Sequence, residues 1–358
     1  MQSQRELQQL MALFQAGRLG EAESAARRLI RRHPDAFVLP NILGAVLSSQ
    51  GRHADALAAF RQALRLKRDY VEAHCNAGIA LCALGRHAES LADFRAAIAL
   101  APGHMDARNN LANAMQECGR HAEAVEVLQA AAQAQPAHPP TWNNLGNALA
   151  ALGRHAEAVA ALRRALALAP DFAQAHNNLG LALLADADVA GALAAFDEAL
   201  LFAPDYPEAH ANRADALRRA GRLADAGAAF ERAIALGLDV PELHNALGNV
   251  FEEMRRFDEA ARAYQAALAR RPAYAEAHNN LGSVLKACGK LDQAAACFER
   301  ALQLDPGFAL AAGNLGRVRL AQGRHAEGLA HLVAHTGFVR LAVDAAPRLI
   351  LELEDATR

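Results

Sequence analysis

The asparagines of this chain are arranged in a way that could bind a polypeptide backbone. All sixteen fall on a 34-residue spacing, at the fifth, sixth or ninth position of a recurring unit. A carboxamide offers both a donor and an acceptor, so it can pair with the C=O and N–H of a peptide unit without reading a side chain. Asparagine is a mediocre helix former, and helix propensity therefore does not explain such a series.

The three positions share one face of a helix. At about 100° per residue they span an arc of about 100°, opposite the apolar positions, so we expect this face to point away from the core. Packed helices lie ~8–10 Å apart, and an extended peptide advancing ~3.3 Å per residue would meet each rung of such a ladder at about every third residue. The fifth-position set is Asn41, Asn109, Asn143, Asn177, Asn245 and Asn279.

The predicted peptide-binding residues are those of the other two positions. Ile42 and Ala246 interrupt the sixth-position series. The alternative is that these amides bond between neighbouring helices or are solvated. The predicted binding set is Asn76, Asn110, Asn144, Asn178, Asn212, Asn280 and Asn314 at the sixth position, with Asn113, Asn147 and Asn249 at the ninth.

Charged residues suggest a selectivity rim in units 207–240 and 241–274. Arg218 and Arg219 are followed one repeat later by Glu252 and Glu253. Either these four residues select charged ligands, or the two pairs neutralise one another. Arg213 occupies a normally apolar position and makes this unit the least regular.

Histidines and cysteines do not predict a metal site. His74, His176, His210, His244 and His278 recur at the fourth position, where Trp142 also occurs, and a second series lies beside the turn. Equivalent sites on adjacent repeats are ~8–10 Å apart, too far to share one metal ion, so packing and turn roles are expected. The five cysteines contain no CxxC pair, which argues against a disulfide framework.

Composition and motifs favour a non-catalytic protein. The phosphate-binding GxxxxGK[ST], the HExxH helix and the GxSxG elbow are all missing from the sequence, and no cofactor is implied. A net charge of −2 gives no drive toward nucleic acid or anionic lipid. We find no spanning segment or secretory signal, so a cytoplasmic location is expected.

Three further 34-residue series define the elements that carry these residues. Proline recurs at seven of nine places from Pro34 onward, small residues recur from Gly44 to Gly316, and turn glycines recur from Gly17 to Gly323 except at Ala187 and Arg255. Phenylalanine, tyrosine or leucine precedes an alanine by three residues in the eight units from 37–70 to 275–308. Each unit is therefore predicted to be two helices joined by a glycine turn.

This period and its small, aromatic and proline positions resemble the tetratricopeptide repeat family. The resemblance implies an all-α solenoid, a right-handed superhelix with first helices lining the concave groove. We expect a continuous array over residues 1–337, with degenerate first and last units. The predicted units are 3–36, 37–70, 71–104, 105–138, 139–172, 173–206, 207–240, 241–274, 275–308 and 309–342.

The His-Asn-Asn-Leu-Gly segments at 176–180 and 278–282 and Trp-Asn-Asn-Leu-Gly-Asn at 142–147 are similar to the repeat domain of O-linked N-acetylglucosamine transferases. In that family an asparagine ladder holds extended polypeptide backbone, a role that the resemblance assigns to the sixth-position asparagines. The transferase's catalytic domain has no counterpart here. Residues 338–358 form a tail predicted either as a short β-hairpin or as a frayed segment on the last repeat.

The sequence thus predicts a scaffold that binds a protein or an extended peptide in its concave groove. Two alternatives stay open. The chain could be the substrate-recruiting part of a protein-modifying enzyme, or a self-assembling array in which repeats bind repeats.

Overall fold

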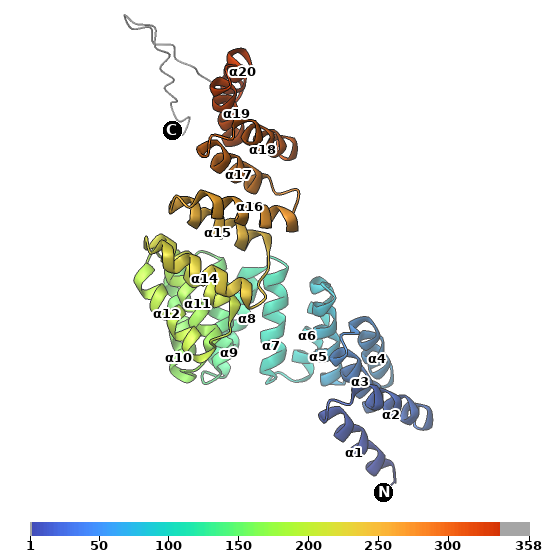
Figure 1. The fold of residues 1–358 in the computed structure, drawn as a ribbon. Helices are drawn as coiled ribbons and strands as arrows, with labels where there is room; N and C mark the ends of the chain where they lie inside the picture. The colour runs from blue at the N-terminus through green and yellow to red at the C-terminus, as the bar shows by residue number, and fades with distance from the viewer. Residues whose placement is uncertain (1, 337–358) are drawn as a thin grey trace, which may run out of the picture. The chain divides into compact units, whose positions relative to one another are not determined.

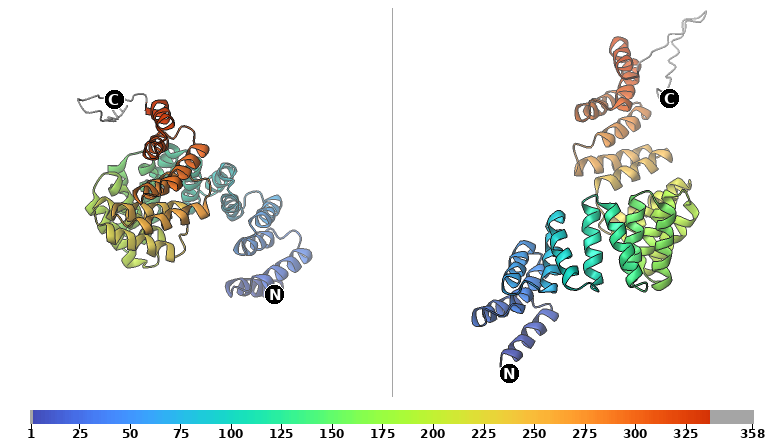
Figure 2. Two further views of the ribbon diagram at one scale, coloured as in Figure 1. Left: turned by 45° about the horizontal axis from the view of Figure 1, so that its top comes forward. Right: turned by 180° about the vertical axis from the view of Figure 1, so that it is seen from behind.

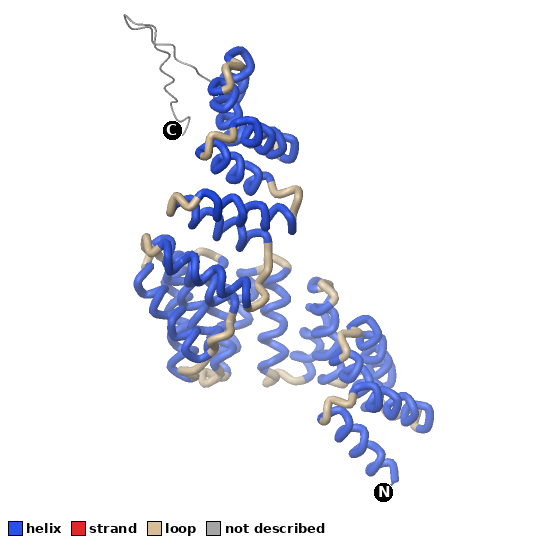
Figure 3. The backbone as a smooth tube through the Cα atoms, in the orientation of Figure 1, coloured by secondary structure: helices blue, strands red, loops and turns tan. Residues whose placement is uncertain are grey.

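A computed structural model describes residues 2–336, and within this range every regular element is an α-helix (Figure 3). The helices follow one another as helix-turn-helix pairs, labelled in Figure 1 and seen from two other sides in Figure 2. The predicted all-α solenoid of helical repeats is confirmed. The predicted β-hairpin of residues 338–358 lies outside the described residues.

The chain forms two compact units, and the first ends at Asp186. Its odd-numbered helices are the first helices of the repeats. The helices of this unit are α1 (Gln2–Gln15), α2 (Leu19–Arg32), α3 (Val38–Ser49), α4 (His53–Leu66), α5 (Val71–Ala83), α6 (His87–Leu100), α7 (Met105–Glu117), α8 (His121–Ala134), α9 (Pro139–Ala151), α10 (His155–Leu168) and α11 (Ala173–Ala185).

The second unit begins at Ala187, inside the predicted repeat 173–206. The division of the sequence into ten repeat units stays a prediction. The helices of this unit are α12 (Val189–Phe202), α13 (Pro207–Arg219), α14 (Leu223–Ala235), α15 (Pro241–Glu253), α16 (Phe257–Arg270), α17 (Ala275–Ala287), α18 (Leu291–Leu304), α19 (Ala309–Ala321) and α20 (His325–Thr336).

The turn inside each pair uses a left-handed residue. Gly51 has φ +76° and Gly119 has φ +72°, as the sequence series predicted. The two exceptions to that series keep the same backbone shape, because Ala187 has φ +63° and Arg255 has φ +59°. The turn geometry is therefore set by the repeat, and these two residues adopt it at a steric cost.

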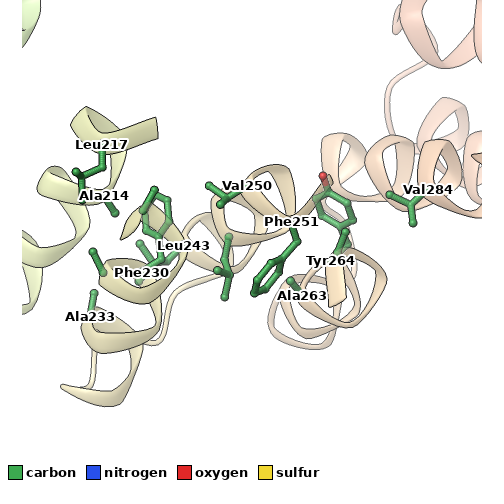
Figure 4. Close-up of a cluster of buried hydrophobic side chains, with 14 of the residues drawn as sticks. Ala214, Leu217, Phe230, Ala233, Leu243, Val250, Phe251, Ala263, Tyr264 and Val284 are labelled. Carbon is green, nitrogen blue, oxygen red and sulfur yellow. The ribbon is translucent and has the colours of Figure 1, made fainter. Parts of the chain in front are cut away.

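Small residues let the two helices of a pair approach closely. A Cβ atom placed on Gly248 of α15 would lie 2.5 Å from the Cε1 atom of Tyr264 on α16, so only a hydrogen fits there. Tyr264 is fully buried in a hydrophobic cluster that runs from α13 to α17 and includes Phe230, Val250 and Val284 (Figure 4). The pairs α13/α14 and α15/α16 thus share one core, which extends to α17.

First helices also contact one another directly. In the first unit α3 contacts α5, α5 contacts α7, α7 contacts α9 and α9 contacts α11; in the second unit α15 contacts α17 and α17 contacts α19. A residue on a first helix can therefore lie in a seam between two first helices even when it points away from the second-helix layer. These seams position the asparagines.

Candidate functional site

The fifth-position asparagines lie inside the seams between first helices. Asn143 is 1% exposed and Asn279 is 2% exposed, and Asn41, Asn109, Asn177 and Asn245 are also buried. The prediction that this position faces away from the core is wrong. A helical wheel gives only the direction of a side chain, and here the neighbouring first helix covers that direction.

Most sixth-position asparagines bond to the buried asparagine of the preceding repeat. In each case the sixth-position Nδ2 donates to the Oδ1 atom of a residue 35 positions earlier. We call these bonds rungs. They are Asn76 to Asn41 at 3.1 Å, Asn144 to Asn109 at 3.2 Å, Asn178 to Asn143 at 2.8 Å, Asn280 to Asn245 at 3.2 Å and Asn314 to Asn279 at 3.1 Å.

The rungs support the alternative that these amides join repeats. Asn143 and Asn279 also donate from Nδ2 to the Oδ1 atoms of Asn144 and Asn280, both at 3.2 Å. Asn314, at the end of the series, is itself buried. Part of the hydrogen-bonding capacity that the ladder prediction reserved for a ligand is therefore used within the array.

Asn110 is different because its rung is missing. The preceding fifth position holds Cys75 in place of asparagine. The Nδ1 atom of His104 accepts from the amide of Ala107, which places the ring proton on Nε2, 3.8 Å from the Cys75 sulfur. The thiol is thus engaged by His104, and among the described residues the carboxamide of Asn110 has no hydrogen-bond partner.

The ninth positions of the first unit form an uncharged row across α5, α7, α9 and α11. The row reads Ile79, Asn113, Asn147 and Leu181, and neither asparagine has a partner within the described part of the chain. Ile79 is 45% exposed and Leu181 is 41% exposed. In the second unit, by contrast, Asn249 accepts hydrogen bonds from Tyr264 and Asn280.

A pocket of about 270 Å³ lies between α5 and α7 where the free asparagines and Ile79 meet. We call it the α5–α7 pocket. Buried Phe94 of α6 forms part of the wall. The lining residues are Ile79, Cys82, His87, Phe94, Asn110, Asn113, Ala114 and Glu117.

The electrostatics of this pocket are set by one acid. Glu117 is its only carboxylate, is exposed, and forms no ion pair among the described residues. It is the last residue of α7, and α5 ends on the same side at Ala83, so the negative ends of two helix dipoles lie nearby. Burial raises the pKa of the Cys82 thiol above its ordinary value, and Glu117 adds to this shift.

The rim residues of the second unit pair with acids of their own chain. Arg218 donates to Glu253 at 3.0 Å, and Arg219 donates to Asp215 at 3.0 Å. The Tyr264 hydroxyl lies 2.8 Å from Glu252 Oε2. Of the four predicted rim residues, only Arg218 and Glu253 pair with one another. Arg213 is likewise paired, with Asp197 at 2.6 Å.

Sequence comparison identifies the repeats. A tetratricopeptide repeat profile matches residues 7–71, 43–105, 188–239 and 245–287, which is more than half of the chain. The chain belongs to the tetratricopeptide repeat (TPR) family. Further TPR profiles match residues 81–145, 146–186, 275–308 and 309–334. The specific likeness to O-linked N-acetylglucosamine transferases is not among these matches.

Solved TPR structures share the fold. A TPR protein from Parabacteroides merdae is 15% identical, with a TM-score of 0.60 over 70% of this chain and 100% of that one. The human IFIT1 dimer with m7Gppp-AAAA is 18% identical, with a TM-score of 0.57 over 91% of this chain and 79% of that one. No curated protein matches by sequence.

Fourth-position residues bond to the loop that precedes their helix, a more specific role than the packing and turn roles that the sequence predicted. The side chains of His74, Trp142 and His278 contact the carbonyl oxygen six residues earlier, at 3.0 Å, 2.9 Å and 3.1 Å. These carbonyls belong to the loop between repeats, which has no helical partner for them. The sequence contained a signal for this role, because the histidines and the tryptophan at the fourth position all carry a ring N–H that can donate a hydrogen bond.

Within residues 2–336 no group of three or more His, Cys, Asp or Glu side chains is placed to hold a metal ion. No helix in that range is long and apolar enough to cross a bilayer.

Proposed function

We propose that this protein is a non-catalytic scaffold that binds an extended polypeptide segment on the first helices of its first unit. The repeats serve as an interaction surface, and the free carboxamides of Asn110, Asn113 and Asn147 hold the ligand backbone. The observation that carries the proposal is the missing rung at Cys75, which leaves Asn110 unpaired beside a pocket.

The division between paired and free asparagines assigns two roles to one residue type. A carboxamide already bonded to a neighbouring repeat stabilises the array, and breaking that bond for a ligand would cost about what the ligand bond returns. A carboxamide without a protein partner has no such competing bond. We therefore assign Asn76, Asn144, Asn178, Asn280 and Asn314 mainly to the array, and Asn110, Asn113 and Asn147 mainly to the ligand.

The ninth-position row sets the reach of the ligand. Ile79 and Leu181 are separated by three helix-to-helix steps of ~8–10 Å each, which an extended chain spans in roughly eight residues. The asparagines in the middle of the row would bond backbone, and the apolar residues at its ends would contact ligand side chains. The row contains no charge, so an uncharged backbone fits it without a desolvated ion.

The test compares free and paired asparagines on the same fold. The double variant Asn110→Ala, Asn113→Ala should keep its melting temperature and lose ~10–30-fold in affinity for members of an immobilised random peptide library, because two neutral hydrogen bonds are removed. The matched control Asn144→Ala, which breaks a rung, should melt earlier and change binding per folded molecule much less. Unchanged binding by the double variant would refute the proposal.

A further inference from the structure

We infer that the α5–α7 pocket binds one apolar side chain of the ligand together with a lysine or arginine two residues away. The inference rests on the proposed function and gives it a ligand class. Its basis is the combination of an apolar wall, two free carboxamides and one unpaired acid in a single pocket.

The size of the pocket fits one side chain. Its volume of about 270 Å³ lies below the ~300–1,000 Å³ of pockets that enclose whole small molecules. Ile79 supplies the exposed apolar surface, because Phe94 and Ala114 also line the pocket but are already buried, and Ile79 is exposed enough to gain from being covered. A leucine, methionine or phenylalanine side chain entering here would remove this surface from water.

The carboxamides fix how that side chain enters. Asn110 and Asn113 lie one helical turn apart on α7 and line the same pocket. Each can pair with a peptide group of the ligand, so the backbone beside the anchoring residue would be held at the rim while its side chain points inward. The carboxamides bind the ligand backbone whatever its sequence, and the pocket adds a preference for one apolar side chain.

The charge preference comes from Glu117 and the helix ends. An exposed carboxylate without an ion pair at the C-terminus of α7 attracts a cation and repels an acid. Alternate side chains of an extended peptide point the same way, so a basic residue two positions from the anchor lies on the same face and can reach Glu117. At the end of α13 in the second unit, by contrast, Arg218 and Arg219 already have acidic partners.

The experiment is a positional scan of synthetic peptides of roughly eight residues against the full chain and four variants. The wild-type protein should select an aliphatic or aromatic anchor with Lys or Arg two positions away. Glu117→Gln should keep the anchor preference and lose about two- to fivefold in affinity for the basic peptides only, and added salt should shrink that difference. Its control is Glu126→Gln, an exposed acid on α8 outside the pocket.

The apolar part is tested at Ile79. Ile79→Asn introduces the residue that α7 and α9 carry at the same repeat position, so the helix should accept it, and it should weaken binding of peptides with an apolar anchor about three- to tenfold. Leu181→Asn on α11 makes the equivalent change outside the pocket, so it should weaken binding of peptides with and without an apolar anchor alike and leave the preference for that anchor intact.

Two results would overturn the inference in different ways. Binding that depends on Asn110 but shows flat side-chain preferences, unchanged by Glu117→Gln, would refute the ligand class and leave the proposed scaffold standing. The absence of any Asn110-dependent peptide binding would refute both.

Discussion

Asn178 donates a hydrogen bond from Nδ2 to the Oδ1 atom of Asn143 at 2.8 Å, joining α11 to α9 across one repeat. Asn143 is almost completely buried, so its oxygen cannot turn to water if the donor is lost. An unpaired buried acceptor costs about 1–3 kcal/mol. This rung therefore supports the stacking of neighbouring repeats.

The first expectation follows from that rung. Asn178→Ala should lower the free energy of unfolding of the full chain by about 1–2 kcal/mol, because the buried oxygen loses its donor. Asn113→Ala, at an exposed position without a partner, should be neutral or stabilise by roughly 0.5 kcal/mol, since alanine is the better helix former. Urea unfolding followed by circular dichroism measures both. Equal effects of the two substitutions would contradict the division into paired and free asparagines.

The second expectation concerns the turn at Ala187. A left-handed conformation costs a non-glycine residue about 1–2 kcal/mol, and glycine gives back part of this through its greater freedom in the unfolded chain. Ala187→Gly should therefore raise the free energy of unfolding by roughly 0.5–1 kcal/mol. Gly221→Ala makes the reverse change at φ +74° and should destabilise by a similar amount. A loss of stability in Ala187→Gly would show that the strain is absent.

The third expectation tests close packing between the helices of a pair. A Cβ atom on Gly282 would lie 2.8 Å from Cε1 of Phe298, so Gly282→Ala should destabilise by about 1–3 kcal/mol. Another repeat of the chain accommodates an alanine at this position by pairing it with a smaller side chain, because Ala112 and Leu128 occupy the equivalent positions on α7 and α8. Adding Phe298→Leu to Gly282→Ala should recover part of the loss. A double-mutant cycle in urea measures the coupling, and simple additivity would rule out a direct clash.

The fourth expectation concerns thiol chemistry. Burial raises the pKa of Cys75 to about 11, so at pH 8 its thiolate fraction is about a hundredfold below that of an ordinary thiol. Mass spectrometry should find Cys75 alkylated by iodoacetamide far more slowly than exposed Cys288. The raised pKa also means that this thiol favours folding fully below pH ~8.5, and that its contribution is lost as pH rises through about 11. Rapid alkylation of Cys75 in the folded protein would contradict its burial.

Much of the fold could be read from spacing alone. The 34-residue series of proline, glycine and alanine predicted the helix pairs and their left-handed turns, because both follow from local sterics within one repeat. The left-handed turn at Arg255 could not be predicted from its residue type, since nothing in an arginine indicates a positive φ.

The candidate site was only partly predictable. The sequence grouped the asparagines correctly but placed the fifth position on an open face, because the contact between one first helix and the next spans 35 residues and has no local signature. The sequence shows that Cys75 replaces asparagine at the fifth position of its repeat. Its consequence for Asn110 required knowing that the fifth position of one repeat bonds to the sixth position of the next.

That relationship gives the last expectation. Cys75→Asn would restore the acceptor that Asn41 and Asn143 provide to their neighbours, so Asn110 should form a rung and no longer be free. Stability should rise by about 1 kcal/mol, offset in part by the loss of the contact between Cys75 and His104. Peptide affinity should fall several-fold, because a ligand must now compete with the introduced side chain for the carboxamide of Asn110.

Cys75→Ala separates the two consequences. It removes the thiol without supplying an acceptor, so it should lower stability and leave peptide affinity unchanged. Thermal melting and peptide titration on the same samples decide the matter: if Cys75→Asn stabilises the protein yet binds peptides as tightly as the wild type, the free carboxamide of Asn110 is not part of the binding surface.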